Sequence, residues 1–103
     1  MRIFIGESDR WKGRPLADTI VEELKREGFA GATVLRGVQG FGAHSKLHRD
    51  SILRLSQDLP VVIEVIDSQE HMDAALPKLD EMLDGGIVTF EKVRVVRYRA
   101  MRG

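Results

Sequence analysis

The stretch that decides the fold of this chain is residues 60–83, PVVIEVIDSQEHMDAALPKLDEML. Residues 61–66 form a run of mostly β-branched side chains and predict a buried strand, with Pro60 at its start, where a missing backbone donor is tolerated. Ser68 then suits the N-cap of a helix. The apolar residues behind it recur at helical spacing, and they are Met72, Ala75, Leu76, Leu79, Met82 and Leu83. Pro77 conflicts with this helix, and we expect it to kink the helix or split it in two.

The rest of the chain alternates between strand and helix signals. Residues 2–6 and 32–36 are short runs of mostly apolar and β-branched side chains and predict strands. Between them, Pro15 suits the first turn of a helix and Gly28 suits its left-handed cap. Residues 40–58 predict a long loop. Residues 93–98 predict the last strand, and residues 87–90 could pair before it.

This order of elements predicts the fold class. It is α+β, with the ferredoxin-like β-α-β-β-α-β arrangement of a two-layer sandwich. The chain has 103 residues and shows no repeat or linker, so we expect residues 1–103 to form a single domain.

The two faces of the predicted sheet indicate assembly. The residues of one parity are apolar and should face the helices, and they are Ile3, Ile5, Val61, Ile63, Val65, Val93 and Val95. The opposite face should meet water, yet beside the charged residues Arg2, Glu64 and Arg94 it carries Phe4, Val62, Ile66, Val96 and Tyr98. Single exposed apolar residues are common, whereas a contiguous apolar patch is typical of a contact surface. We therefore expect an oligomer that forms through the sheet.

The composition narrows the functional classes. The 16 basic and 16 acidic residues give a net charge of zero, which argues against a general nucleic-acid binder. The absence of cysteine excludes disulfides and thiolate metal sites. No stretch reaches the roughly 20 apolar residues of a membrane span, and the strand-like start leaves no room for a signal peptide. We expect a cytoplasmic protein without membrane insertion. After Glu91 every charged residue is basic, which leaves a local anion site open.

Glycines and arginines offer the first candidate chemistry. The segment GVQGFG at residues 37–42 could bring backbone N–H groups close to an anion. Its order differs from the dinucleotide-binding fingerprint and no helix follows it directly, so a turn that requires positive φ is the simpler interpretation. Arg97 and Arg99 could pair with phosphate groups, or they could protect a sheet edge.

Two polar clusters offer further chemistry. His44 and His48, with Asp50 nearby, could bind a metal, although an ordered site needs three or four convergent ligands. Residues 7–9, Glu-Ser-Asp, could supply a general base, but the same residue types are typical of turns and caps. No catalytic triad, carboxylate pair or nucleophile elbow stands out, so we do not expect an enzyme.

Three segments resemble the PII family of signal-transduction proteins. Residues 31–42, GATVLRGVQGFG, resemble the strand that leads into the long T-loop of that family, and residues 58–67, DLPVVIEVID, resemble the strand that returns from it. The opening IFIGES, with Gly13 and Pro15-Leu16, is similar to the PII-like branch known as domain of unknown function 190. The likeness runs in order over residues 2–98.

The resemblance implies a PII-like trimer whose sheets face inward and whose intersubunit clefts bind an adenine nucleotide. The residues implied for ligand binding are Gly37, Gly40, Phe41 and Gly42 at the base of the loop, Gly85 and Gly86 after the second helix, and Arg97 and Arg99 near the C-terminus. The turn after the second helix lacks the lysine of typical PII proteins. AMP or another small anion is therefore expected in preference to a di- or triphosphate.

The leading hypothesis is a non-enzymatic regulatory trimer that needs no cofactor and signals through the 40–58 loop to a partner protein. Relatives are sometimes encoded near membrane transport proteins, so the resemblance implies a channel or transporter as partner. The alternative is a trimer that binds a divalent metal through His44, His48 and Asp50, as other trimeric ferredoxin-like proteins do. RNA binding is not expected, because residues 36–38, Arg-Gly-Val, lack the aromatic residue of an RNA-binding sheet.

Overall fold

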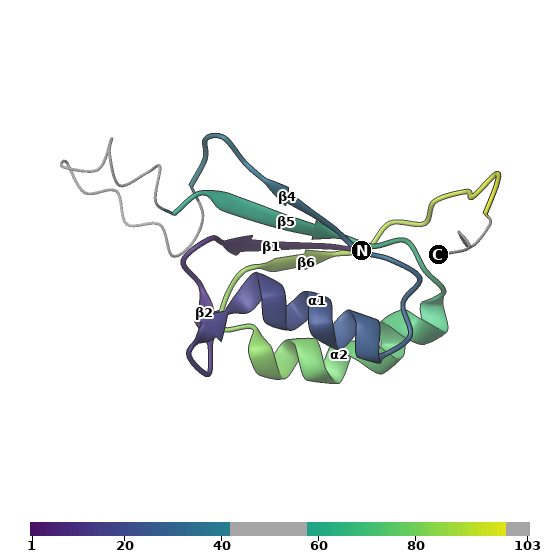
Figure 1. The fold of residues 1–103 in the computed structure, drawn as a ribbon. Helices are drawn as coiled ribbons and strands as arrows, with labels where there is room; N and C mark the ends of the chain where they lie inside the picture. Colours follow the sequence, from purple (N-terminus) through teal and green to yellow (C-terminus); the bar gives the residue numbers. More distant parts are fainter. Residues whose placement is uncertain (42–57, 99–103) are drawn as a thin grey trace.

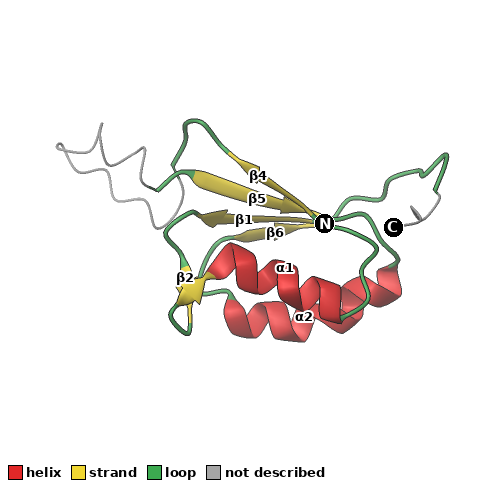
Figure 2. Cartoon of the chain, in the orientation of Figure 1, coloured by secondary structure: helices red, strands yellow, loops and turns green. Residues whose placement is uncertain are grey.

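The computed structural model describes residues 1–41 and 58–98, which form a four-stranded sheet and two helices that cover one of its faces (Figure 1, Figure 2). In chain order the elements are β1 (Arg2–Gly6), β2 (Arg10–Trp11), β3 (Arg14–Pro15), α1 (Leu16–Arg26), β4 (Thr33–Arg36), β5 (Pro60–Glu64), α2 (Gln69–Met82) and β6 (Ile87–Thr89). The predictions for the loop that holds Gly42, His44, His48 and Asp50, and for Arg99, concern residues outside the described ranges.

The main sheet has the strand order β4-β5-β1-β6, and every neighbouring pair is antiparallel. Each helix connects two strands that are separated by one other strand, because β5 lies between β1 and β4, and β1 lies between β5 and β6. This arrangement confirms the predicted α+β class and is compatible with the ferredoxin-like fold.

The core lies between the sheet and the helices. Along β1 and β5, alternate side chains point to the helices, as the period of two in a strand requires. The largest fully buried side chains are Ile3 and Ile63 from the sheet, Ile20 and Leu24 from α1, and Leu79 from α2. The buried positions predicted for residues 3, 5, 61, 63 and 65 are therefore confirmed.

Two of the predicted helix signals act at the positions expected, whereas Pro15 lies in β3 and at the N-cap, directly before the first turn of α1. Gly28 follows α1 with a φ of +88°, as predicted for a left-handed cap. Ser68 is the N-cap of α2, and its side-chain oxygen accepts a hydrogen bond from the His71 N–H at 3.2 Å.

Pro77 does not split α2, so this part of the prediction was wrong. The helix runs without interruption from Gln69 to Met82. Proline at position 77 leaves the Asp73 carbonyl without its helical donor, but both residues lie on the exposed side of α2, where water can hydrate that carbonyl. Neither of the two helices in the described part of the chain is long and apolar enough to cross a membrane.

The predicted last strand, residues 93–98, was also wrong. These residues form no strand, and Val93 and Val95, which were expected to face the helices, are 53% and 54% exposed. Instead β6 pairs with β1 directly after the turn that follows α2. Because β6 already occupies that edge of β1, residues 91–98 have no free strand to pair with there, and they run away from the sheet (Figure 1).

Candidate ligand-binding site

The glycines at the end of β4 pack closely over Pro60. The Gly37 N–H donates to the Pro60 carbonyl oxygen at 2.7 Å, and a Cβ added at Gly37 would lie 2.6 Å from Pro60 Cγ. A Cβ added at Gly40 would lie 3.0 Å from the same atom. Close packing against Pro60 thus explains why glycine occupies these two positions without invoking a ligand, which favours the turn interpretation. Phe41 is 73% exposed.

The fold also explains the two glycines that follow α2. Gly85 and Gly86 have φ values of +99° and +84°, in the left-handed region that glycine adopts without strain. A Cβ added at Gly86 would lie 2.6 Å from the Phe4 carbonyl oxygen, at the position where Phe4 pairs with Ile87. The turn therefore brings residue 86 directly against β1, and the fold requires glycine there whether or not a ligand binds.

Within one chain, the predicted ligand residues that the structure describes lie at two opposite ends of the sheet. Gly37 follows β4 and Gly86 precedes β6, both at the end where β1 finishes. These two glycines sit on different edge strands, with β5 and β1 between them. Arg97 belongs to the C-terminal segment, which leaves the sheet at the end where β1 starts (Figure 1). A single chain therefore does not bring them together.

Arg97 lines a cleft of about 850 Å³, which we call the C-terminal cleft. Its walls come from the connection between α1 and β4, from the end of β5 with the connection to α2, and from residues 95–98. Ile66, Val95 and the Tyr98 ring supply apolar surface. Within the described residues Arg97 has no ion-pair partner. The cleft thus combines a cation with apolar and aromatic walls.

Asp67 and His71 form a hydrogen-bonded pair in the wall of this cleft. Asp67 Oδ1 accepts from His71 Nδ1 and from the Ser68 N–H at 2.7 Å, and Asp67 Oδ2 accepts from the Ala30 N–H at 3.0 Å. Burial raises the pKa of Asp67, but these three donors more than offset it and hold the pKa at about 2. Asp67 is therefore ionised at neutral pH and fixes the orientation of the His71 ring.

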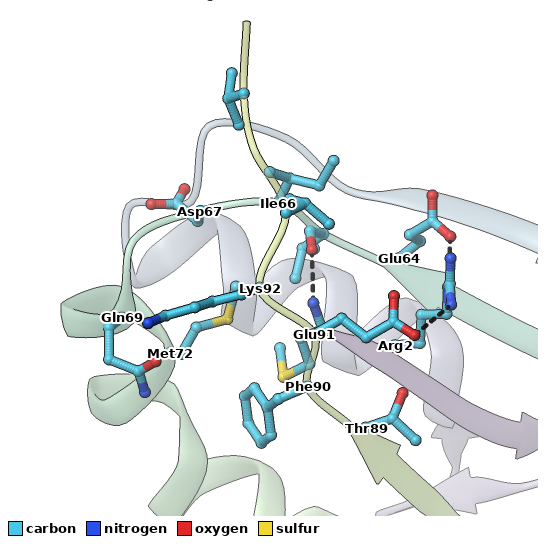
Figure 3. Close-up of a pocket in the computed structure, with 14 residues that line it drawn as sticks. Arg2, Glu64, Ile66, Asp67, Gln69, Met72, Thr89, Phe90, Glu91 and Lys92 are labelled. Carbon is cyan, nitrogen blue, oxygen red and sulfur yellow. Dashed lines mark hydrogen bonds and ion pairs between the residues drawn. The ribbon is translucent and has the colours of Figure 1, made fainter.

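A smaller cleft of about 380 Å³ shares residues 64–67 and Val95 with the C-terminal cleft, and it is also lined by the start of β1 and by residues 89–93 (Figure 3). Here Arg2 Nε donates to Glu64 Oε2 at 2.9 Å, and Arg2 Nη1 lies 3.8 Å from Glu91 Oε1. The hydrogen bond to Glu64 and the charges of both carboxylates raise the pKa of Arg2. Because Arg2 is already paired with two carboxylates, the side-chain cation left for an anion in this cleft is Lys92.

The polar residues 7–9 act as turn residues that link neighbouring strands. Asp9 Oδ2 accepts from the Gly6 N–H at 2.9 Å. Asp58 Oδ1 accepts from the Ser8 hydroxyl at 2.8 Å and from the Ser8 N–H at 3.2 Å. Glu7 forms an ion pair with Arg36. These contacts join the end of β1 to the end of β4 and to the residues before the start of β5, so they support the structural interpretation over a general base.

Sequence reasoning missed the Asp67–His71 pair. The signal that could have revealed it is the spacing of four residues at the start of a helix, which brings the two side chains to the same face. The alternative metal site on His44, His48 and Asp50 lies outside the described residues. Within residues 1–41 and 58–98, no group of three or more His, Asp or Glu side chains is placed to hold a metal ion.

Comparison with known proteins confirms the resemblance to domain of unknown function 190. The family model DUF190, described as "Uncharacterized ACR", matches residues 1–95. A UPF0166 protein of Methanocaldococcus jannaschii is 37% identical over 98 residues, which cover 94% of this chain and 90% of the relative. A UPF0166 protein of Aquifex aeolicus is 32% identical over 96 residues, which cover 93% of this chain and 90% of the relative. The names of these relatives state no ligand or activity.

Proposed function

This chain belongs to the DUF190 family, and on that premise we propose that it is a cytoplasmic, non-enzymatic, PII-like regulatory trimer. It binds a small anionic ligand, an adenine nucleotide such as AMP, in clefts between subunits. It signals through the 40–58 loop to a partner protein, for which a membrane transport protein is the leading candidate. The observation that carries the proposal is the C-terminal cleft, where Arg97 and Tyr98 lie at the opposite end of the sheet from the glycine turns.

The open face of the sheet supports the trimer. The strand register aligns four apolar residues in one row across all four strands, and they are Leu35, Val62, Phe4 and Ile87. Leu35 is 50% exposed and Ile87 62% exposed. In the neighbouring row, Arg2 and Glu64 neutralise each other at 2.9 Å. A continuous apolar row of this kind favours burial against the same row of other subunits.

The position of the two sets of ligand residues supports a site between subunits. A heterologous contact joins one patch of a subunit to a different patch of the next, and three such contacts close a ring. Patches at opposite ends of one sheet suit this arrangement. The cleft that holds Arg97 would then be completed by one glycine turn of the neighbouring subunit, at Gly37 or at Gly86, since these two turns lie on opposite edges of the sheet. Its volume of about 850 Å³ falls in the usual range for small-molecule sites.

The chemistry of the cleft fits a nucleoside monophosphate. A guanidinium group can bind phosphate through two parallel hydrogen bonds, and an exposed tyrosine ring can stack on a base. Arg97 and Tyr98, which are adjacent in the chain, both line the cleft, with Ile66 and Val95 as apolar wall. The turn after α2 runs Gly85-Gly86-Ile87 and adds no lysine for a further phosphate. Loop 40–58 begins at the Gly40 turn, so a ligand against that turn would act on the loop directly.

Calorimetry with AMP, ADP and ATP tests the proposal. We expect AMP to bind, and Arg97→Ala to weaken binding at least tenfold, because a charged hydrogen bond contributes about 1.5–3 kcal/mol. Arg14→Ala is the matched control, since Arg14 is an exposed arginine that pairs with Glu22 at 2.6 Å, outside the lining of the cleft. Absence of heat with all three nucleotides at millimolar concentration would rule out nucleotide binding. Equal affinity in both arginine variants would rule out this site.

A further inference from the structure

The geometry of His71 gives the C-terminal cleft a second polar group. The ionised Asp67 carboxylate can only accept hydrogen bonds, so Nδ1 of His71 must carry the proton that joins them. The other ring nitrogen, Nε2, lies toward Gly28, where an added Cβ would be 3.6 Å away. Both Gly28 and His71 line the cleft. The pair therefore holds Nε2 at the cleft wall.

The helix does not need His71 for its cap. Ser68 Oγ already accepts the backbone N–H of residue 71, and Asp67 already accepts the N–H groups of Ser68 and Ala30. The Phe29 ring lies beside the imidazole, with ring centroids 5.5 Å apart. Packing by Phe29 and hydrogen bonding to Asp67 fix the ring on two sides, while 41% of the His71 side chain stays exposed. A ring held in this way is suited to contact a ligand.

The charges around His71 favour an anion. The titratable residues that share the cleft lining with it are Glu64, Asp67, Arg97 and Tyr98, and its charged neighbours on α2 are Glu70 and Asp73. Arg97 repels a metal ion. Asp67 is occupied by three donors, and Glu64 is paired with Arg2. Asp73 accepts a hydrogen bond from Gln69 at 2.9 Å. A positive imidazole that shares the cleft with Arg97 thus meets mostly compensated carboxylates.

We propose that His71, in its protonated form, is a second contact for the anionic group of the ligand in the C-terminal cleft. Nε2–H of the imidazolium donates to the anion, Asp67 is the positioning residue, and Arg97 is the permanent cation. With Nδ1–H bonded to Asp67, only the imidazolium form carries a second proton, on Nε2, that can be donated to an anion, so the site binds anions more tightly as the pH falls. The identification of AMP as the natural ligand rests on the proposed function, whereas the anion contact itself does not.

Sulfate is the probe that isolates this contact, because its charge does not change between about pH 5.5 and about pH 8. We expect its affinity, followed by the amide signals of Gly28 and Gly31 in NMR titrations, to be about tenfold higher at the lower pH. His71→Asn keeps an N–H donor for Asp67 but removes Nε2, and it should abolish this difference. Lys78→Gln removes a positive charge from the same helix, next to Trp11, and should leave the difference unchanged.

Two further measurements separate the outcomes. In the wild-type protein, nitrogen signals of the His71 ring should respond to sulfate, which tests the contact even if the asparagine variant fails to fold.

AMP titrations of the wild-type protein and of His71→Asn then distinguish the His71 contact from the proposed nucleotide function. If AMP binds both proteins equally and the pH effect on sulfate remains in the variant, the His71 contact is refuted and the proposed function stands. If AMP does not bind but the sulfate effect depends on His71, the nucleotide function is refuted and the anion contact stands. If neither anion affects His71, the contact is refuted.

Discussion

Replacing Gly86 with alanine should destabilise the fold clearly more than replacing Gly13 with alanine. Both glycines have positive φ, +84° at Gly86 and +79° at Gly13, so both variants carry similar backbone strain. They differ in their surroundings. A Cβ at Gly86 would lie 2.6 Å from the Phe4 carbonyl oxygen, whereas a Cβ at Gly13 would have nothing within 4 Å.

The comparison isolates the cost of that contact. A left-handed backbone costs a non-glycine residue about 1–2 kcal/mol, and the loss of glycine's freedom in the unfolded chain returns about 0.4–1 kcal/mol. Both terms apply to both variants and cancel in the difference. Gly86→Ala must also move β6 away from β1, because real Cβ contacts essentially never fall below 3.0 Å. Overpacking of this kind costs about 1–3 kcal/mol, which is the expected difference in the free energy of unfolding.

Urea unfolding at one fixed protein concentration measures the difference. Trp11 is the single tryptophan and packs against the edge of the core, so its fluorescence reports the transition. A fixed concentration is needed because the stability of an oligomer depends on it. Equal midpoints and slopes for the two variants would refute the argument that the fold requires glycine at position 86. That result would leave close approach of a ligand as the reason for Gly86.

Three other variants test separate parts of the structure. Phe4→Glu places a charge in the apolar row of the open face and should leave a folded monomer in light scattering, since an unpaired buried charge costs several kcal/mol; a persisting trimer would contradict the proposed interface. Asp67 has its pKa lowered from 3.8 to about 2, so its stabilising contacts are present above about pH 4 and lost as the pH falls toward 2. The urea midpoint of wild type should therefore fall more than that of Asp67→Asn over this range, and parallel curves would show that the three donors do not stabilise the fold. Pro77→Ala should raise the free energy of unfolding by about 2 kcal/mol, because the helix penalty of proline of about 3 kcal/mol exceeds its effect on the unfolded chain; a loss of stability would mean that the exposed Pro77 ring makes a contact that the alanine cannot replace.

The sequence correctly predicts those parts of the fold in which the local residue pattern agrees with the position of the segment in the tertiary structure. Residues 61–66 and 2–6 combine strand-forming side chains with central positions in the sheet. The prediction holds for residues 2–6 and for 61–64, whereas Val65 and Ile66 lie beyond the end of β5. Residues 93–98 have the same strand-forming character, but a strand also needs a free edge to pair with. The edge of β1 is taken by Ile87–Thr89, which follows the turn after α2 directly. Composition alone does not indicate which of two neighbouring segments pairs with the edge of β1.

In the candidate site, too, some features could be predicted from the sequence and others depend on the tertiary structure. The glycines of residues 37–42 could be assigned to a turn from their type, but not the contact of Gly37 with Pro60, which depends on the pairing of β4 with β5. The Asp67–His71 pair depends on where the helix begins, and Ser68 fixes that position. Once Ser68 is known to be the N-cap, the spacing of four residues places Asp67 and His71 on the same side of the helix start, so this pair could have been predicted from the sequence.

The separation of the predicted ligand residues ties binding to assembly. Arg97 and the glycine turns lie at opposite ends of one sheet, so under the proposed function the complete site exists only between subunits. A ligand that binds only the trimer stabilises the trimer by mass action. Phe4→Glu should then weaken AMP binding as well as assembly, although the Phe4 side chain lies on the open face of the sheet. A cleft that is complete in one chain would bind AMP equally in the monomer, so the affinity of the monomeric variant decides whether the site belongs to one subunit or to two.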